Sequence, residues 1–124
     1  MIKAVIFDMD GVIINSEPLH KEAFQKMFKE FNLKVSNKLY GSFTGMSTLP
    51  ICQRLCNEFS IKHSPNLLVK TKRKHFKNLF ENGYEFKLID GVLELIQHYK
   101  KNGISLVLAS SASMPNINMV FEKF

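Results

Sequence analysis

The stretch AVIFDMDGV, residues 4–12, decides the fold that we expect for this chain. It begins with an uninterrupted apolar run over residues 4–7 and continues into two carboxylates one residue apart, Asp8 and Asp10. Short apolar runs of this kind are typical of parallel strands that are covered on both faces. Because open α/β sheets bind ligands at the carboxyl ends of their strands, the two carboxylates indicate a site at that edge.

A second strand is predicted over residues 104–109, and it runs into Ser110 and Ser111. A helix predicted from about Asp90 to residue 101 separates it from a preceding helical region. Two strands joined through a helix are expected to be parallel, since an antiparallel pair needs no helix between its strands. The carboxyl ends of both strands would then lie at one edge of the sheet.

The residues between the strands are predicted to form three or four helices. Helix start signals recur at Ser16, Ser47 and Ser64, and apolar residues follow them at helical spacing. We therefore predict an α/β fold with a Rossmann-like parallel core made of residues 1–14 and 87–124, interrupted by an α-helical insert of residues 15–86.

Length and composition exclude several classes of protein. The chain has 124 residues, 45% hydrophobic and 23% charged, as expected for one globular domain. No apolar stretch approaches the roughly 20 residues of a membrane span, and the N-terminus lacks a signal-peptide pattern, so we expect a cytoplasmic protein without a membrane partner. Cys52 and Cys56 are expected to be packed thiols, because further zinc ligands at metal spacing are missing.

Positive charge is concentrated in the predicted helical insert. The formal net charge is +6, and residues 15–86 hold 12 Lys/Arg against 6 Asp/Glu. Residues 70–77 alone hold five Lys/Arg, with Phe76 expected to face the core. A solvated helix face is the favoured interpretation, an electrostatic aid to capture of an anionic substrate comes second, and nucleic-acid binding comes last. We therefore expect no nucleic-acid partner.

Two carboxylates held close together repel each other unless a cation or a shared proton relieves them. Mg²⁺, bound by one or two carboxylates and by phosphate oxygens, would do so, and one carboxylate could then attack phosphorus while the other moves protons. Gly11 permits a tight turn beside a ligand, and Ser110 and Ser111 offer groups that suit a phosphate. The alternatives are an Asx turn at Asp8 and Asp10, and simple helix capping by Ser110.

These motifs resemble those of a known superfamily. FDMDGVI, residues 7–13, resembles the first signature of the haloacid dehalogenase superfamily, and LVLASS, residues 106–111, resembles its second. Residues 15–20 and 90–92 are similar to the branch that carries a small helical cap after the first strand and includes β-phosphoglucomutase and many small phosphatases. The resemblance implies a haloacid-dehalogenase-type core with residues 15–86 as its cap domain.

The resemblance also implies roles for individual residues. Asp8 would be the nucleophile and Asp10 the general acid/base, with Mg²⁺ held by the Asp8 carboxylate and the Asp10 main-chain carbonyl. Ser110 would bind the transferring phosphate, and Ser111, Gly11 and His20 are further candidates for binding the substrate or its phosphate. His20 resembles the family's cap-hinge histidine, and the alternative for it is a surface or packing role. The expected activity is Mg²⁺-dependent hydrolysis of a small phosphate monoester, such as a sugar phosphate, through an aspartyl-phosphate.

The chain departs from the superfamily pattern in three ways. The superfamily's third signature, a lysine, and its fourth, an acidic pair, would lie beyond Phe124, so we expect the 124-residue chain to be inactive alone and to need its missing part, for example a complementing C-terminal fragment. Asn15 stands where an aspartate is usual. Thr48 stands where the mutase carries an arginine that can clamp a second phosphate, which favours a phosphatase. The alternatives are a phosphosugar mutase and a non-catalytic fragment or basic binding module.

Overall fold

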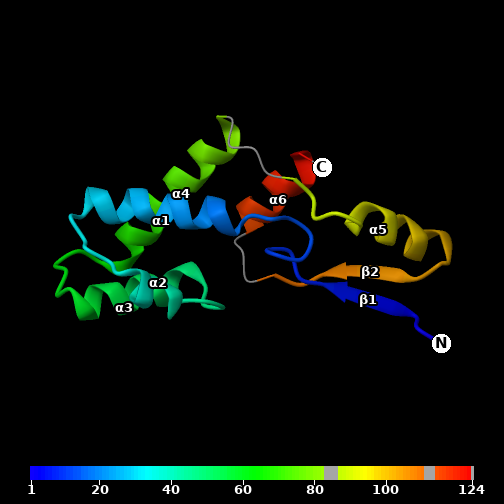
Figure 1. The fold of residues 1–124 in the computed structure, drawn as a ribbon, viewed down its shortest axis with the longest axis horizontal. Coiled ribbons are helices and arrows are strands. Elements are labelled where there is room, and N and C mark those ends of the chain that lie inside the picture. The colour runs from blue at the N-terminus through cyan, green and yellow to red at the C-terminus, as the bar shows by residue number, and fades with distance from the viewer. Residues whose placement is uncertain (83–86, 111–113, 124) are drawn as a thin grey trace. The chain divides into compact units, whose positions relative to one another are not determined.

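A computed structural model describes residues 1–82, 87–110 and 114–123 (Figure 1). The chain divides into two compact units: Met1–Pro18 with Glu85–Phe124, called the α/β unit here, and Leu19–Tyr84, called the helical unit. The assignment of residues 15–86 as a cap domain stays a prediction. The elements in chain order are β1 (Ala4–Phe7), α1 (Glu17–Glu30), α2 (Asn37–Gly41), α3 (Thr48–Glu58), α4 (Pro65–Glu81), α5 (Val92–Lys101), β2 (Ser105–Leu108) and α6 (Met114–Lys123).

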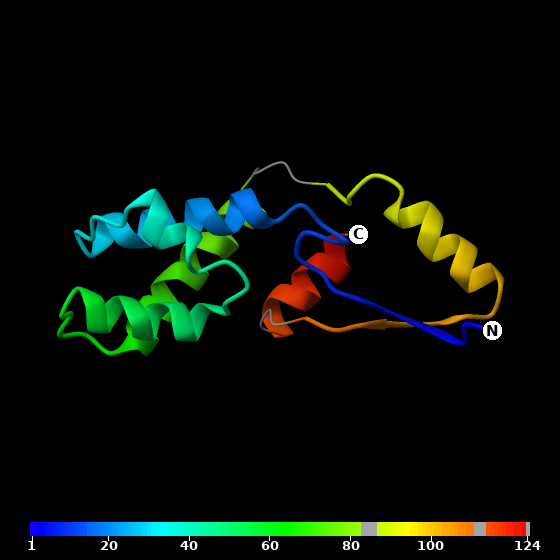
Figure 2. The same ribbon diagram turned by 60° about the horizontal axis from the view of Figure 1, so that its bottom comes forward.

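The two strands pair in parallel, as predicted, and lie side by side in both views (Figures 1 and 2). Their register runs from Ala4 opposite Ser105 to Phe7 opposite Leu108. Helix α5 packs against β2, and the Tyr99 ring lies 6.4 Å from that of Phe7. The helix connection dictates this parallel pairing, because it returns the chain to the same end of the sheet before β2 begins.

The sheet is covered less than its apolar sequence predicts. Side chains on a strand alternate between faces, and in each strand one set is half-buried while the other is exposed. Ile6 is 69% exposed and its register partner Val107 is 49% exposed. The expectation that these strands are covered on both faces is therefore wrong for the described residues, which leave one apolar face open.

The helical unit, by contrast, encloses a core. Helices α1, α3 and α4 supply side chains that are almost entirely buried, and Tyr40 of α2 packs its ring against three phenylalanines of the same unit. These contacts arise because each helix carries apolar residues three or four positions apart. The buried cluster comprises Phe24, Met27, Phe28, Phe43, Ile51, Cys52, Leu55, Leu68 and Val69. No helix in the described ranges is both long and apolar enough to cross a membrane.

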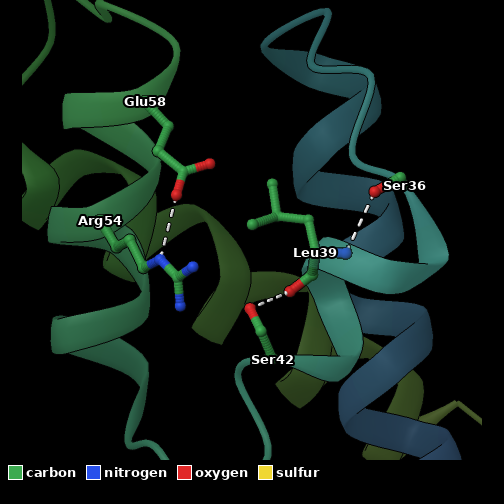
Figure 3. A network of polar contacts seen from close by, with 5 residues as sticks. All are labelled: Ser36, Leu39, Ser42, Arg54 and Glu58. Carbon is green, nitrogen blue, oxygen red and sulfur yellow. Dashed lines mark hydrogen bonds and ion pairs between the residues drawn. The ribbon is translucent and has the colours of Figure 1, made fainter.

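Local polar contacts cap both ends of the short helix α2 and link two turns of α3 (Figure 3). The Ser36 hydroxyl accepts a hydrogen bond from the Leu39 amide at the start of α2 (3.0 Å), and the Ser42 hydroxyl donates to the Leu39 carbonyl at its end (2.6 Å). On α3, Arg54 and Glu58 pair one turn apart at 3.1 Å. Exposed pairs of this kind add little stability, so the unit depends on its apolar core.

The cysteines are free thiols, as predicted. Cys52 lies in the core and Cys56 is half-buried one turn further along α3. Burial, with a smaller contribution from the neighbouring Cys56, raises the pKa of the Cys52 thiol from 9.0 to about 12. Burial also raises the pKa of Cys56. Both groups are therefore protonated and poorly nucleophilic near neutral pH.

Candidate active site

The loop after β1 is built around Met9. Its side chain is buried, and its carbonyl accepts hydrogen bonds from the amides of three following residues. Asp8 is exposed, and its Oδ1 accepts from the Met9 amide at 2.8 Å. No described residue contacts the other oxygen, Oδ2, through a hydrogen bond or an ion pair. Asp8 thus presents an open carboxylate oxygen from a fixed backbone.

Gly11 allows this loop to turn sharply. Its φ of +77° lies in the left-handed region, which favours glycine over residues that carry a Cβ. Its amide donates to the Ile14 carbonyl at 2.8 Å, which closes the loop around Asp10. The predicted turn role of Gly11 is confirmed, whereas its role in binding phosphate stays a prediction.

Asp10 is held by a residue to which the sequence assigned only a helix-start role. The Ser16 hydroxyl donates a short hydrogen bond to Asp10 Oδ1, and Ser16 is fully buried. Asp10 itself is half-buried. A hydrogen bond to a charged carboxylate is stronger than one between neutral groups, so Ser16 fixes the orientation of this carboxylate.

The end of β2 reaches the same edge of the sheet. The Ala109 amide donates to the Phe7 carbonyl at 2.8 Å, which continues the strand pairing by one step. Asp8 follows Phe7 and Ser110 follows Ala109, so both come directly after the paired strand ends. Ser110 is half-buried. Ser111, which we predicted to bind phosphate, lies outside the described residues.

The two chain segments that connect the units pair with each other in the α/β unit. Ile14 and Leu88 form an antiparallel bridge, and the Ile89 amide donates to the Ile13 carbonyl at 2.8 Å. The segment that leaves the Asp10 loop is therefore hydrogen-bonded directly to the segment around Leu88 and Ile89.

His20 lies at the start of α1 and contacts two residues of α4. Its Nδ1 lies 2.9 Å from Lys72 Nζ, and its ring stacks on Phe76 with the centroids 4.5 Å apart. His20 is therefore held against two buried side chains of α4, Lys72 and Phe76.

Lys72 is a buried cation that the sequence interpretation placed wrongly. It belongs to the basic run at 70–77, for which a solvated face was favoured, yet it is only 1% exposed. Its Nζ also lies 3.4 Å from Thr48 Oγ1 and within 5.1 Å of the ring centroids of Phe24 and Phe76. Lys72 is four residues from both Leu68 and Phe76, which are buried, and this helical spacing could have predicted that it faces the core.

The donor chemistry of this edge is compatible with Mg²⁺. Two carboxylates and a main-chain carbonyl follow β1, and Mg²⁺ needs only one or two protein carboxylates when phosphate and water complete its shell. Across residues 1–82, 87–110 and 114–123, however, no group of three or more His, Cys, Asp or Glu side chains is arranged to hold a metal ion. The residue types after β1 are thus ones that Mg²⁺ accepts, and the Mg²⁺ site at Asp8 and Asp10 stays a prediction.

A family model and several individual proteins match most of the length of this chain. Residues 5–124 match the family model described as haloacid dehalogenase-like hydrolase. A phosphorylated carbohydrates phosphatase from Thermotoga maritima is 30% identical over 110 residues, which are 89% of this chain and 50% of that protein. The pyrophosphatase PpaX of Oceanobacillus iheyensis is 25% identical over 121 residues, 98% of this chain and 53% of that protein.

A similar solved structure is that of CbbY from Rhodobacter sphaeroides in complex with phosphate. It has a TM-score of 0.79 and 26% sequence identity, over 97% of this chain and 56% of that one. The chain thus spans about half the length of the relatives that it matches. In each of them the matched half and the remainder belong to one chain, which gives no support to a separate complementing fragment.

Proposed function

The chain belongs to the haloacid dehalogenase-like hydrolase family, and on this premise we propose that it supplies the nucleophilic edge of a phosphatase for small phosphate monoesters. The observation that carries the proposal is the arrangement at the ends of β1 and β2, where Asp8, Asp10 and Ser110 follow paired strands. The phosphorylated carbohydrates phosphatase among the relatives makes a sugar phosphate a reasonable class of substrate.

The proposed reaction has two steps. Asp8 attacks phosphorus, the bond from phosphorus to the leaving oxygen breaks, and Asp10 gives its proton to that oxygen. Asp10 then takes a proton from water, whose oxygen attacks the aspartyl-phosphate, and the bond between phosphorus and the Asp8 carboxylate breaks to release phosphate. The open Oδ2 of Asp8 suits attack, and the Ser16 hydrogen bond suits an acid/base group that needs a fixed direction.

Other residues complete the proposal. Ser110 and Gly11 would contact the phosphate, and His20 would contact the substrate. The Asp8 carboxylate and the Asp10 main-chain carbonyl would hold Mg²⁺, which would supply positive charge beside the phosphate oxygens. We assign the helical unit the role of a cap domain that controls access of substrate and water, because both of its connections run through the bridged segment at Ile14 and Leu88.

The test is a screen of the intact protein against a panel of phosphate esters with Mg²⁺. We expect release of phosphate that Asp8→Asn abolishes and that Asp10→Asn lowers by about 100- to 10,000-fold, the usual contribution of a general acid/base. Full turnover by Asp8→Asn would show that the nucleophile is another residue. If the protein converted a sugar 1-phosphate into its 6-phosphate isomer without releasing free phosphate, its activity would be that of a mutase and not of a phosphatase.

A further inference from the structure

The exposed side of α4 carries a row of positive charge. Lys70, Arg73, Lys74 and Lys77 are all exposed, whereas Lys72 and Phe76 point into the core. Lys70 and Lys74 are four residues apart, as are Arg73 and Lys77, so all four positions lie on one side of the helix. They cover about 10 Å of its length at 1.5 Å per residue. We call these four residues the basic stripe.

The basic stripe is not neutralised by neighbours. None of its four side chains makes an ion pair or hydrogen bond within the part of the chain that the structure describes. Helix α4 has a carboxylate only at its end, Glu81, and Glu30 of α1 already pairs with His75 at 2.8 Å. Four like charges without counter-charges repel one another, and a polyanion would relieve that repulsion.

The charge of the whole helical unit supports the same conclusion. Leu19–Tyr84 holds 12 Lys/Arg and 4 Asp/Glu, a formal charge of +8, whereas the rest of the chain holds 5 and 7, a charge of −2. A long-range potential of one sign over one unit raises the rate at which an anionic partner arrives. The basic excess is therefore a property of one unit and not of the chain as a whole.

We propose that the basic stripe is a docking surface for the phosphate backbone of a double-stranded nucleic acid, bound without sequence preference. Single strands are usually held by exposed aromatic side chains that stack on bases, and the aromatic residues of this segment, Phe76 and Phe80, are buried. Contacts through charge alone suit a duplex backbone. This differs from the expectation from sequence, because the structure adds the alignment and the missing counter-charges.

The test measures binding of a fluorescent DNA duplex to the full chain by anisotropy at several salt concentrations. With four phosphate contacts, we expect a slope of log K against log salt of about −3.6, or roughly a 100-fold loss of affinity between 50 and 200 mM salt. The variant K70Q/R73Q/K74Q/K77Q should bind at least about tenfold more weakly at low salt, with a slope near zero.

A matched control separates the stripe from net charge. K3Q/K87Q/K100Q/K101Q removes four exposed charges from the α/β unit and should keep the affinity and slope of the wild type. The charge-conserving K70R/K74R/K77R should also bind, because it keeps the charge of the stripe, and the circular dichroism spectrum of K70Q/R73Q/K74Q/K77Q should match that of the wild type. An equal loss in both glutamine variants would overturn the proposal. So would tighter binding of polyglutamate or anionic lipid vesicles than of the duplex, since the partner would then be of another class.

Discussion

The two units of this chain differ in how completely they bury their apolar residues. The helical unit encloses a cluster in which Leu55 and Leu68 are fully buried. The α/β unit leaves Ile6 and Val107 exposed on one face of a two-stranded sheet. An isolated pair of strands has little stability, and parallel sheets are ordinarily covered on both faces. Among the described residues, the large buried apolar cluster belongs to the helical unit, whereas the proposed chemistry belongs to the α/β unit.

Matched truncations in the two units should have very different effects. Leu55→Ala removes a fully buried side chain and should lower the free energy of unfolding by about 2–5 kcal/mol. Val107→Ala shortens an exposed side chain and should change it by less than about 0.5 kcal/mol. Urea denaturation of both variants checks this. Equal losses would mean that the sheet face at Val107 is covered in solution, and the comparison would fail.

A smaller effect is expected from the contact that orients Asp10. Ser16→Ala removes the donor to the Asp10 carboxylate, and loss of a hydrogen bond to a charged group should lower the unfolding free energy by about 1.5–3 kcal/mol. Ser42→Ala removes an exposed hydroxyl that donates to the Leu39 carbonyl in the helical unit. Its loss should lower the unfolding free energy by less than about 1 kcal/mol. Similar values for the two variants would show that Ser16 contributes no more than a surface serine.

The smallest effect concerns the thiols of α3. Because burial raises the pKa of Cys52 to about 12, a thiol reagent near pH 7 should modify Cys56 first and Cys52 only after unfolding. A raised folded pKa also means that the contribution of Cys52 to stability is complete below pH 9.0 and declines as the pH rises toward 12. Mass spectrometry of timed samples measures the order, and faster labelling of Cys52 would contradict its burial.

Several features of the fold followed from local patterns. The parallel strands were predictable because both are short apolar runs joined by a helix, and their register brings Asp8 and Ser110 to one edge. Gly11 was predictable because a chain that turns at once after a strand needs a left-handed residue. The family resemblance is confirmed, since its model matches residues 5–124.

Other features depend on tertiary contacts that a local pattern does not contain. Ser16 has the position of a helix start, and its bond to Asp10 depends on how the intervening loop folds back. Lys72 is one of the five Lys/Arg of residues 70–77, a composition that indicates an exposed helix face. Its own position lies on the buried side of α4, so it is buried although the charged residues around it are exposed. Single residues that oppose the trend of their neighbours are therefore the ones that sequence reasoning misses.

The central claim is that Asp8 captures phosphorus. It is tested most directly by incubating the intact protein with a small phosphate monoester and Mg²⁺, quenching with acid and locating any phosphoryl group by peptide mass spectrometry. We expect one phosphoryl group on the peptide that contains Asp8, labile to hydroxylamine as an acyl phosphate is, and none in Asp8→Asn. A stable phosphoryl group on another residue, or equal labelling of Asp8→Asn, would contradict the account.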